Sequence, residues 1–444
     1  MNTSNLVERM RSWPSEIALV TGTKSTQYDE LISEVESWLE RLADAKITAG
    51  SVVSIEGDYS PTTVAALFAV WMIDAIAVPL APDSASHHDQ FCETAEVQFR
   101  IQLQQDEILI TSTQAEAQHE LYVSLRERSH PGLVLFTSGT SGPNKAAVHD
   151  VAALLNKYET PRQRLRTLVF LQMDHIGGIN TLLYTFSNGG CVIVASERTP
   201  RDICQAIEQN QVELLPTSPT FLNMMLLSGE FDSRDLSSLR VITYGTEPMP
   251  ETTLKRLAQK LPDVRLKQTY GMTELGILGS KSRASDSLWV RVGGDGFETK
   301  IIDNRLWVRA KTAMMGYLNA PSPFDEDGFL DTGDRVEVDG EWIKILGRDG
   351  DTINVGGSKV DPAEVENVLL QLEGVADVVV KSEAHPITGQ IVSALVQLTT
   401  SEPFKEFKVR ARQHCKELLP SYAVPARFRK TDQPLHSSRF KRIR

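Results

Sequence analysis

The sequence predicts an α/β protein, in which a large N-terminal body of layered, mostly parallel sheets with helices precedes a small α+β C-terminal cap domain. The first observation is that short apolar runs alternate with amphipathic segments over roughly the first 345 residues, which is typical of buried parallel strands joined by crossover helices. The second is a change near that point, where residues 347–357 become rich in Gly and Asp. We therefore expect two domains, residues 1–348 and residues 349–444.

The expected strands of the body are short and apolar. They cover residues 52–55, 77–80, 133–136, 168–171, 191–195 and 241–244, and the clearest helices cover residues 28–43 and 250–261. The apolar stretch 64–80 predicts a buried helix that runs into a buried strand. Asp74 lies between the two, where a helix often ends in the left-handed conformation that Asp tolerates.

The segment after the body predicts a different layout. Residues 335–345 predict a hairpin with Asp339-Gly340 at its turn. Beyond it we expect helices at 362–372 and 403–419 and strands at 378–380 and 392–397, which together make the small α+β unit.

The composition is that of a globular protein with an acidic balance. The chain has 444 residues, 41% hydrophobic content and a formal net charge of -12, which argues against a protein built to neutralise nucleic-acid phosphate. The four cysteines are scattered without a CxxC spacing, which argues against a disulfide framework or a zinc site. The first residues lack the apolar core of a signal peptide, and no apolar segment reaches membrane-spanning length. We expect a cytoplasmic protein that does not bind nucleic acid and does not span a membrane.

The segment "LVLFTSGTSGPNKAAVHD", residues 133–150, places a polar loop after an expected strand. Glycines let the backbone approach an anion, hydroxyl and backbone N–H groups donate to it, and a lysine adds positive charge. The candidate phosphate-binding residues are Thr137, Ser138, Gly139, Thr140, Ser141, Gly142 and Lys145. Residues 146–158 are expected to be helical. The GxxxxGK[ST] pattern of a P-loop is missing, so this segment alone also fits a polar surface turn.

Further segments place this loop in a larger pattern. The loop is similar to the signature (S/T)SG(S/T)TGxPKG of the adenylate-forming superfamily, which includes acyl-CoA synthetases, aryl-acid ligases, luciferases and adenylation domains. Other segments resemble that family in its own order: residues 28–84, "MDHIGGI" (173–179), "YGTEPMP" (244–250), "QTYGMTELG" (268–276), "GYLNAPSPFDEDGFLDTGD" (316–334), "GRDGDTINVGGSKVDPAEVE" (347–366) and "LPSYAVPARFRKTDQPLHSS" (419–438). Essentially the whole chain therefore resembles this family.

The resemblance implies an ATP-dependent carboxylic acid ligase. In such enzymes a carboxylate attacks the α-phosphate of ATP to give an acyl-adenylate and pyrophosphate, and a thiol then displaces AMP. Both reactants of the first step are anions, so Mg²⁺, phosphate-binding donors and lysines must offset their repulsion. The implied cofactors are ATP, Mg²⁺ and coenzyme A, or the phosphopantetheine of an acyl carrier protein. The implied partner is a small carboxylic acid.

The resemblance also assigns residues to the reacting phosphates. Thr273 would contact the α-phosphate, and Glu274 would coordinate Mg²⁺ together with Thr137, because this hard cation prefers oxygen ligands. Taken alone, Glu274 would be an ordinary solvated carboxylate.

The nucleoside is assigned in the same way. Asp334 would accept hydrogen bonds from the ribose hydroxyls, and Arg348 would donate to the same sugar. Tyr270 would stack on adenine against the turn of Gly245, Thr246 and Glu247. Without the resemblance, Asp334 and Arg348 would be interpreted as ordinary charged loop residues, and Tyr270 as a residue that packs in the core.

Two segments that contain histidine indicate a function less clearly than the motifs above. The resemblance places His175 among the catalytic residues, where it would line or gate the acid pocket without transferring a proton, while a lone histidine is more often structural. Asp174 replaces the usual aromatic residue and either places an acceptor near the substrate or faces solvent. The run 87–89 with Cys92 has poor spacing for a metal site, and we expect a solvated loop there.

The end of the chain departs from the family pattern Pro-x-Thr-x-(S/N)-Gly-Lys, because Phe440 stands in the place of the lysine. Lys441, one residue later, is the candidate that would bridge the substrate carboxylate and the α-phosphate, with Arg439 as the second candidate. Gly350 replaces the usual hinge Asp or Lys, and glycine permits the backbone rotation that a mobile cap needs.

The sequence thus predicts an acid–CoA ligase with its site between two domains. Two alternatives remain: a stand-alone adenylating enzyme that loads an acyl carrier protein or an amine, and a catalytically impaired nucleotide-binding relative. Small residues near His175 and Gly271 leave room for an aromatic or medium aliphatic acid. "KAAVH" (145–149) is similar to the o-succinylbenzoate branch of the family.

Overall fold

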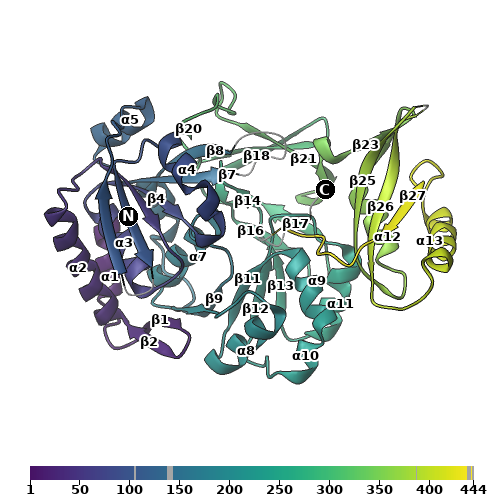
Figure 1. Ribbon diagram of the computed structural model, residues 1–444, viewed down its shortest axis with the longest axis horizontal. Coiled ribbons are helices and arrows are strands. Elements are labelled where there is room, and N and C mark those ends of the chain that lie inside the picture. Colours follow the sequence, from purple (N-terminus) through teal and green to yellow (C-terminus); the bar gives the residue numbers. More distant parts are fainter. Residues whose placement is uncertain (105–106, 138–143, 387, 438–441, 443–444) are drawn as a thin grey trace.

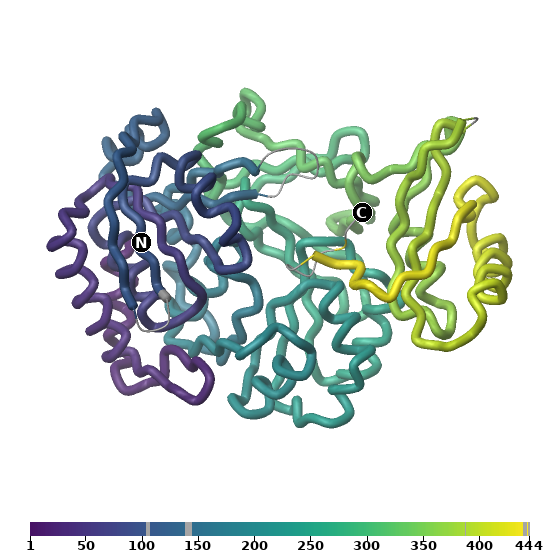
Figure 2. Tube along the Cα trace, in the orientation of Figure 1, coloured from purple at the N-terminus to yellow at the C-terminus, as the bar shows by residue number. Residues whose placement is uncertain are grey.

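The computed structural model describes residues 1–104, 107–137, 144–386, 388–437 and 442. Figure 1 shows a large body and, at its right, a smaller unit built from the last part of the chain. In Figure 2 the yellow segment after this unit's last strand runs back toward the body. The predicted α/β architecture, a large body with a small cap, is confirmed.

The first sheet of the body has the strand order β13-β12-β11-β9-β10-β1-β2. Its strands are β1 (Ile17–Thr21), β2 (Lys24–Gln27), β9 (Arg166–Val169), β10 (Cys191–Val194), β11 (Leu214–Thr217), β12 (Val241–Tyr244) and β13 (Arg265–Gln268). In the described residues its pairings are parallel apart from β1 with β2. The carboxyl ends of β9 to β13 therefore meet at one edge, which is where open α/β sheets bind ligands.

The second sheet has the order β20-β8-β7-β4-β3-β5-β6. Its strands are β3 (Val52–Glu56), β4 (Ile76–Leu80), β5 (Phe99–Gln104), β6 (Glu107–Ser112), β7 (Gly132–Thr137), β8 (Lys145–Asp150) and β20 (Gly316–Tyr317). Strands β3, β4, β5 and β7 pair in parallel, whereas β6, β8 and β20 are antiparallel to their neighbours.

The helix expected at 146–158 is wrong for its first five residues. Residues 145–150 form β8, which pairs with β7 in register from Thr137↔Lys145 to Gly132↔Asp150. Residues 146–150 are buried, and pairing satisfies their backbone groups without a helix. Asp150 then accepts hydrogen bonds from two backbone N–H groups and starts a short helix at Val151.

Local signals explain where several helices begin. The helices are α1 (Thr3–Met10), α2 (Tyr28–Asp44), α3 (Pro61–Met72), α4 (His88–Thr94), α5 (Glu120–Arg128), α6 (Val151–Leu155), α7 (Ile176–Ser187), α8 (Pro200–Asn210), α9 (Pro219–Ser228), α10 (Glu230–Ser233), α11 (Glu251–Lys260), α12 (Pro362–Leu369) and α13 (Phe404–Leu418), with short 3₁₀ turns η1 (Pro82–His87), η2 (Asn156–Tyr158) and η3 (Asp349–Asp351). Helices α3, α8 and α9 start with a hydroxyl cap, Ser60, Thr199 or Ser218, followed by proline. The hydroxyl accepts an orphan N–H, and proline suits the first helical position because its φ is preset.

Helix α3 is apolar on all sides because it is buried on all sides. It packs against α2 within the core between the two sheets, where Phe68 and Trp71 are fully enclosed. Asp74 follows it with φ 55°, which confirms the expected left-handed residue. No helix among the described residues has both the length and the apolar character that crossing a membrane requires.

Residues 280–348 form a third sheet that the alternating pattern did not anticipate. Its order is β16-β17-β22-β21-β19-β18, from β16 (Ser280–Ser282), β17 (Trp289–Val292), β18 (Phe297–Ile302), β19 (Arg305–Ala310), β21 (Leu330–Asp339) and β22 (Trp342–Arg348). The described pairings are antiparallel. The expected hairpin at 335–345 is its β21–β22 pair, and this part is confirmed.

The cap contains the elements expected for it. A sheet of order β24-β23-β26-β25, with β27 beside β26, carries α12 and α13 on one face. Its strands are β23 (Ile353–Val355), β24 (Ser358–Val360), β25 (Val375–His385), β26 (Gly389–Leu398) and β27 (Arg427–Lys430). It has an apolar core of its own, with Phe407 fully buried.

Candidate active site

A single cleft of about 2120 Å³ gathers the candidate residues that the structure describes. It is lined by Thr137, Lys145, His175, Gly245, Thr246, Glu247, Tyr270, Thr273, Glu274, Asp334 and Arg348, and also by cap residues 380–382 and by Arg442. Ser138 to Gly142, Arg439 and Lys441 lie outside the described residues. Residues from distant parts of the sequence thus converge on one space.

One wall of the cleft is made by the turns after β12 and β13. The two turns pack so closely that a Cβ on Gly245 would lie 2.8 Å from the backbone oxygen of Thr269, so only glycine fits there. Thr246 has φ 73°, an uncommon conformation for a residue with a side chain. Glu247 accepts hydrogen bonds from the backbone of Thr220 at 2.7 Å and of Arg442 at 3.2 Å, which holds the turn in place.

Tyr270, Asp334 and Arg348 form a connected group at the floor of this wall. The Tyr270 hydroxyl donates to Oδ2 of Asp334 at 2.6 Å, and Nε of Arg348 lies 3.4 Å from Oδ1. Asp334 and Arg348 face each other in the β21–β22 pair. Burial raises the pKa of Asp334, while Tyr270 and Arg348 act to lower it. Each carboxylate oxygen keeps a further lone pair, so Asp334 can still accept from a ligand.

A second group joins the β7–β8 hairpin to the loop after β14 (Gly271–Met272), which pairs with β15 (Gly276–Ile277). The Tyr317 hydroxyl donates to Oε1 of Glu274, and Nζ of Lys145 lies 5.1 Å from the centre of the Tyr317 ring. Burial, and then the contact with Glu274, raise the pKa of Tyr317 above its usual value. The sequence analysis did not predict Tyr317 as a site residue, although it is the second residue of the segment "GYLNAPSPFDEDGFLDTGD".

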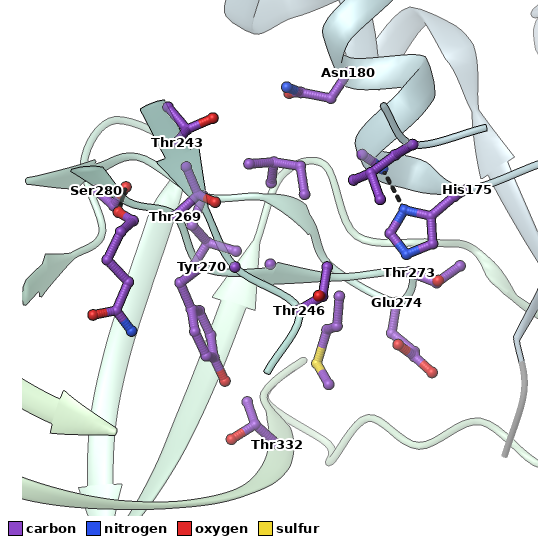
Figure 3. Close-up of a pocket in the computed structure, with 18 of the residues that line it drawn as sticks. His175, Asn180, Thr243, Thr246, Thr269, Tyr270, Thr273, Glu274, Ser280 and Thr332 are labelled. Carbon is purple, nitrogen blue, oxygen red and sulfur yellow. Dashed lines mark hydrogen bonds between the residues drawn. The ribbon is translucent and has the colours of Figure 1, made fainter. Parts of the chain in front are cut away.

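His175 occupies the position before α7. Its Nδ1 accepts a hydrogen bond from the backbone N–H of Gly177 at 3.0 Å, which orients the ring toward the cleft in Figure 3. Asp174 is buried, so of the two alternatives considered for it, the one in which it faces solvent is wrong. A Cβ at Gly178 would lie 2.0 Å from the backbone oxygen of residue 172, so this helix start needs glycine.

His149 is a buried residue that packs behind the loop carrying Thr273. It lies on β8, is fully buried, and its ring faces the backbone of Thr273. Burial lowers its pKa to about 4, with the Thr273 backbone opposing the shift. The imidazole is therefore neutral near pH 7.

The end of the chain ties the cap to the body. Nη1 of Arg442 donates to Glu366 at 2.6 Å, and Nη2 lies 3.4 Å from Asp377, while the backbone N–H reaches Glu247. The exposed fractions of the Arg442 and Glu366 side chains are 9% and 1%, so these charges are removed from water. Burial raises the pKa of Asp377, and Arg442 opposes this shift.

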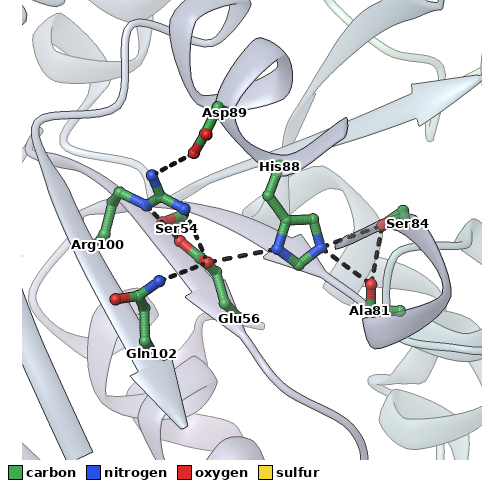
Figure 4. Close-up of polar contacts among 8 residues, drawn as sticks. All are labelled: Ser54, Glu56, Ala81, Ser84, His88, Asp89, Arg100 and Gln102. Atoms are coloured by element: carbon green, nitrogen blue, oxygen red, sulfur yellow. Dashed lines mark hydrogen bonds and ion pairs between the residues drawn. The ribbon is translucent and has the colours of Figure 1, made fainter. Parts of the chain in front are cut away.

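The run 87–89 is not a solvated loop, contrary to expectation. His88 begins helix α4 and is buried beside the second sheet, with Nδ1 3.3 Å from Glu56 and Nε2 3.0 Å from the carbonyl oxygen of Ala81 (Figure 4). Arg100 donates to both oxygens of Glu56, at 2.6 and 3.0 Å. Burial opposes the charged form of His88, but the contacts with Glu56 and with the Ala81 carbonyl outweigh it, so the pKa of His88 is raised. No periodic pattern marked this histidine as buried.

Comparison with known proteins identifies this arrangement. The family model for "AMP-binding enzyme" matches residues 6–318, and that for "AMP-binding enzyme C-terminal domain" matches residues 364–439. The chain belongs to the AMP-binding enzyme family. The predicted membership of the adenylate-forming superfamily and the predicted enzyme class, an AMP-forming acid ligase, are confirmed.

Relatives within the AMP-binding enzyme family cover nearly the whole chain. The indoleacetate–CoA ligase of Aromatoleum aromaticum is 29% identical over 437 residues, 86% of this chain and 85% of that protein. The 2-succinylbenzoate–CoA ligase of Bacillus velezensis is 26% identical over 470 residues, 96% of this chain and 93% of that protein. The crystal structure of the anthranilate CoA ligase AuaEII in complex with anthranoyl-AMP has a TM-score of 0.84 and 19% identity, covering 100% of this chain and 95% of that one, which shows the common fold.

Proposed function

We propose that this AMP-binding enzyme is an acid–CoA ligase in which the residues predicted from the sequence act together in the cleft. The observation that carries the proposal is that all described candidates line one space of about 2120 Å³. A pocket for one small ligand is roughly 300–1,000 Å³, so this cleft has room for a nucleotide beside an acid. The names of the relatives favour CoA as the acceptor over an acyl carrier protein or an amine.

In the first step an oxygen of the substrate carboxylate bonds to the α-phosphorus of ATP, and the bond from that phosphorus to pyrophosphate breaks. Lys145 and the Thr273 hydroxyl would offset the negative charge on the phosphates, together with the loop residues 138–142. His175 would line the acid's reactive end, since its ring is held at the start of α7.

The nucleoside would lie along the other wall. Tyr270 would contact adenine beside the 245–247 turn, and Asp334 with Arg348 would bind the ribose hydroxyls. Because these residues contact one another, the Asp334 carboxylate and the Arg348 guanidinium are already in position before the nucleotide binds. This reduces the entropy that binding would lose by ordering their side chains.

The donor chemistry around Glu274 fits Mg²⁺. The Glu274 carboxylate and the Thr137 hydroxyl are hard oxygen ligands that line the same cleft. The described residues contain no cluster of three His, Cys, Asp or Glu side chains that could hold a metal, but Mg²⁺ usually takes only one or two carboxylates beside waters and substrate phosphates. When bound, it would supply positive charge to the triphosphate.

In the second step the CoA sulfur bonds to the acyl carbon, and the bond from that carbon to AMP breaks. We place the domain boundary between Arg348 and Asp349, with Gly350 as the hinge about which the cap rotates between the steps. Lys441, with Arg439 as the second candidate, remains our proposal for the cation that bridges carboxylate and α-phosphate.

The test is a panel of aryl, fatty and amino acids given to the full chain with ATP and Mg²⁺. We expect at least one acid to support pyrophosphate release, and added CoA to yield AMP and an acyl-CoA of the matching mass in equal amounts. Chelating Mg²⁺ should abolish both. Absence of pyrophosphate release with every acid would overturn the proposal, and release without thioester would overturn CoA as the acceptor.

A further inference from the structure

The cleft continues past His175, away from the residues proposed to bind the nucleotide. In Figure 3, Asn180 and Thr243 lie at one end of the view and Thr332 at the other. One side of this extension is a face of α7, because Gly177, Asn180 and Tyr184 line it at helical spacing.

The opposite side of the extension is a face of the first sheet. Two cross-strand pairs of β12 and β13 line it: Val241 with Arg265 and Thr243 with Lys267. Alternate residues of a strand point to the same face. The side chains of Arg265 and Lys267 are therefore presented to the same space as Thr243.

Basic side chains gather in this extension. Lys157 and Lys267 are half-buried there, and Arg162 and Arg265 are exposed at its rim. Nζ of Lys157 donates to Oδ1 of Asn180 and, at 3.2 Å, to the carbonyl oxygen of Ile277, so the ammonium is held by neutral groups and keeps a third donor.

The charged groups that act on the two lysines are arginines, which are positive like the lysines themselves. Burial, and then Arg162, lower the pKa of Lys157 to about 7, and burial, then Arg265 and Arg162, lower the pKa of Lys267. Within the part of the chain that the structure describes, neither lysine forms an ion pair. Acidic residues also line the cleft, and among the described residues none of them forms an ion pair with either lysine: Glu247, Glu274, Asp295, Asp331, Asp334, Asp349 and Asp351.

Partly buried ammonium groups without a counterion are costly, and a bound anion would offset that cost. We propose that the acid substrate carries a second anionic group, a carboxylate, at the end remote from its reacting carboxyl, and that Lys157 and Lys267 bind it. This inference rests on the proposed function and names the class of acid that the site takes.

The geometry also limits the separation of the two carboxylates. Asn180, which holds Lys157, follows His175 by five residues, about 7 Å along a helix axis. A substrate whose carboxylates are separated by a single ring or a medium aliphatic chain fits this span. An acid with an apolar end would leave the lysines without a counterion.

The experiment compares acids that differ only at the remote end: adipate with hexanoate, and terephthalate with para-toluate. For the wild type we expect kcat/KM for AMP formation to favour each diacid by about tenfold or more, the size expected of a hydrogen bond to a charged group. Lys157→Met and Lys267→Met should each reduce this preference by about tenfold. Lys255→Met, which removes an exposed lysine paired with Glu251 on α11, should leave the preference unchanged.

Binding of the same acids in the presence of AMP, measured by calorimetry, separates this inference from the proposed function. Diacid binding that weakens in Lys157→Met and Lys267→Met supports the inference even if no acid is turned over. The inference is overturned if the wild type uses each mono-acid as well as its diacid, or binds it more tightly, and if neither lysine variant changes this ratio. Melting temperature and AMP affinity show whether each variant is folded. If Lys157→Met does not fold, the result for Lys267→Met alone supports or overturns the inference.

Discussion

The hydroxyl of Tyr270 donates a 2.6 Å hydrogen bond to the buried carboxylate of Asp334, which joins the loop after β13 to the sheet that leads to the cap. The two residues are 64 positions apart in the chain and lie next to each other only in the folded protein. This contact links the proposed adenine contact to the proposed ribose contact.

Tyr270→Phe should weaken nucleotide binding because it leaves one oxygen of Asp334 without its donor in a buried position. Loss of one partner of a buried hydrogen bond costs about 1–3 kcal/mol, so we expect AMP affinity to fall about tenfold and stability to fall by a similar free energy. Calorimetry and urea unfolding measure the two effects. Tyr422→Phe, at an exposed tyrosine, is the control, and equal AMP affinity in both variants would contradict the prediction.

Glu274→Gln should slow adenylate formation with little change in AMP binding. The substitution keeps the shape of the side chain and its contact with Tyr317 but removes the charge proposed to hold Mg²⁺. We expect kcat for pyrophosphate release to fall about 100-fold or more, and the Mg²⁺ concentration for half-maximal rate to rise. Glu298→Gln, on the exposed face of β18, should change neither value. An unaltered Mg²⁺ dependence in Glu274→Gln would exclude this ligand.

Arg442→Met should loosen the cap. The variant removes the cation that contacts the buried carboxylates of Glu366 and Asp377, and breaking a buried charge pair costs about 3–5 kcal/mol. Hydrogen exchange should increase at the contacts between cap and body, such as the Asn223 side chain to Ala376 bond. Arg429→Met removes an exposed partner of Glu383 and should cost about 0–1 kcal/mol. Equal exchange in both variants would show that Arg442 does not hold the cap.

Acid should destabilise the protein through His149. Its folded pKa of about 4 is below its ordinary value of 6.5, so the unfolded chain binds the proton more tightly. The free energy of unfolding should therefore fall as pH drops from about 6.5 toward 4, by at most about 1.4 kcal/mol per pH unit. Urea unfolding at several pH values measures this slope. His149→Leu should flatten it, whereas a slope equal to the wild type would assign the acid sensitivity to other groups.

Glu56→Gln tests the cluster in Figure 4. The change removes the buried carboxylate that faces both Arg100 and His88 and leaves Arg100 with the exposed carboxylate of Asp89, so we expect a loss of about 3 kcal/mol. Asp89→Asn alters the exposed contact of the same arginine and should cost about 0–1 kcal/mol. Thermal unfolding compares the two, and equal losses would contradict a buried role for Glu56. Catalytic rates should change little in either variant, because this cluster does not line the cleft.

Much of the site could be predicted from the sequence because its residues lie in short local segments with distinctive composition. The segment "YGTEPMP" encodes a turn by its glycine and prolines, and "QTYGMTELG" places Tyr270, Thr273 and Glu274 within five residues of one another. Where such segments follow buried parallel strands, their meeting at one edge follows from the fold class. The remote basic residues were not predicted, because Lys157 and Lys267 resemble ordinary surface lysines until α7 and β13 enclose them.

The sequence by itself predicted most of the alternating strands and helices of the first two sheets, the left-handed Asp74 and the division into body and cap, since periodicity and backbone preference act over a few residues. Only the tertiary structure decided that 145–150 pair with β7 as a strand, that His88 is buried against Glu56, and that Arg442 lies between Glu366 and Asp377. The strand pairing depends on the neighbouring strand of a hairpin, and the other two contacts depend on partners 32 and 76 positions away. The physical reason is that the cost of burying a polar or charged group is set by which group faces it, and local sequence does not contain that information.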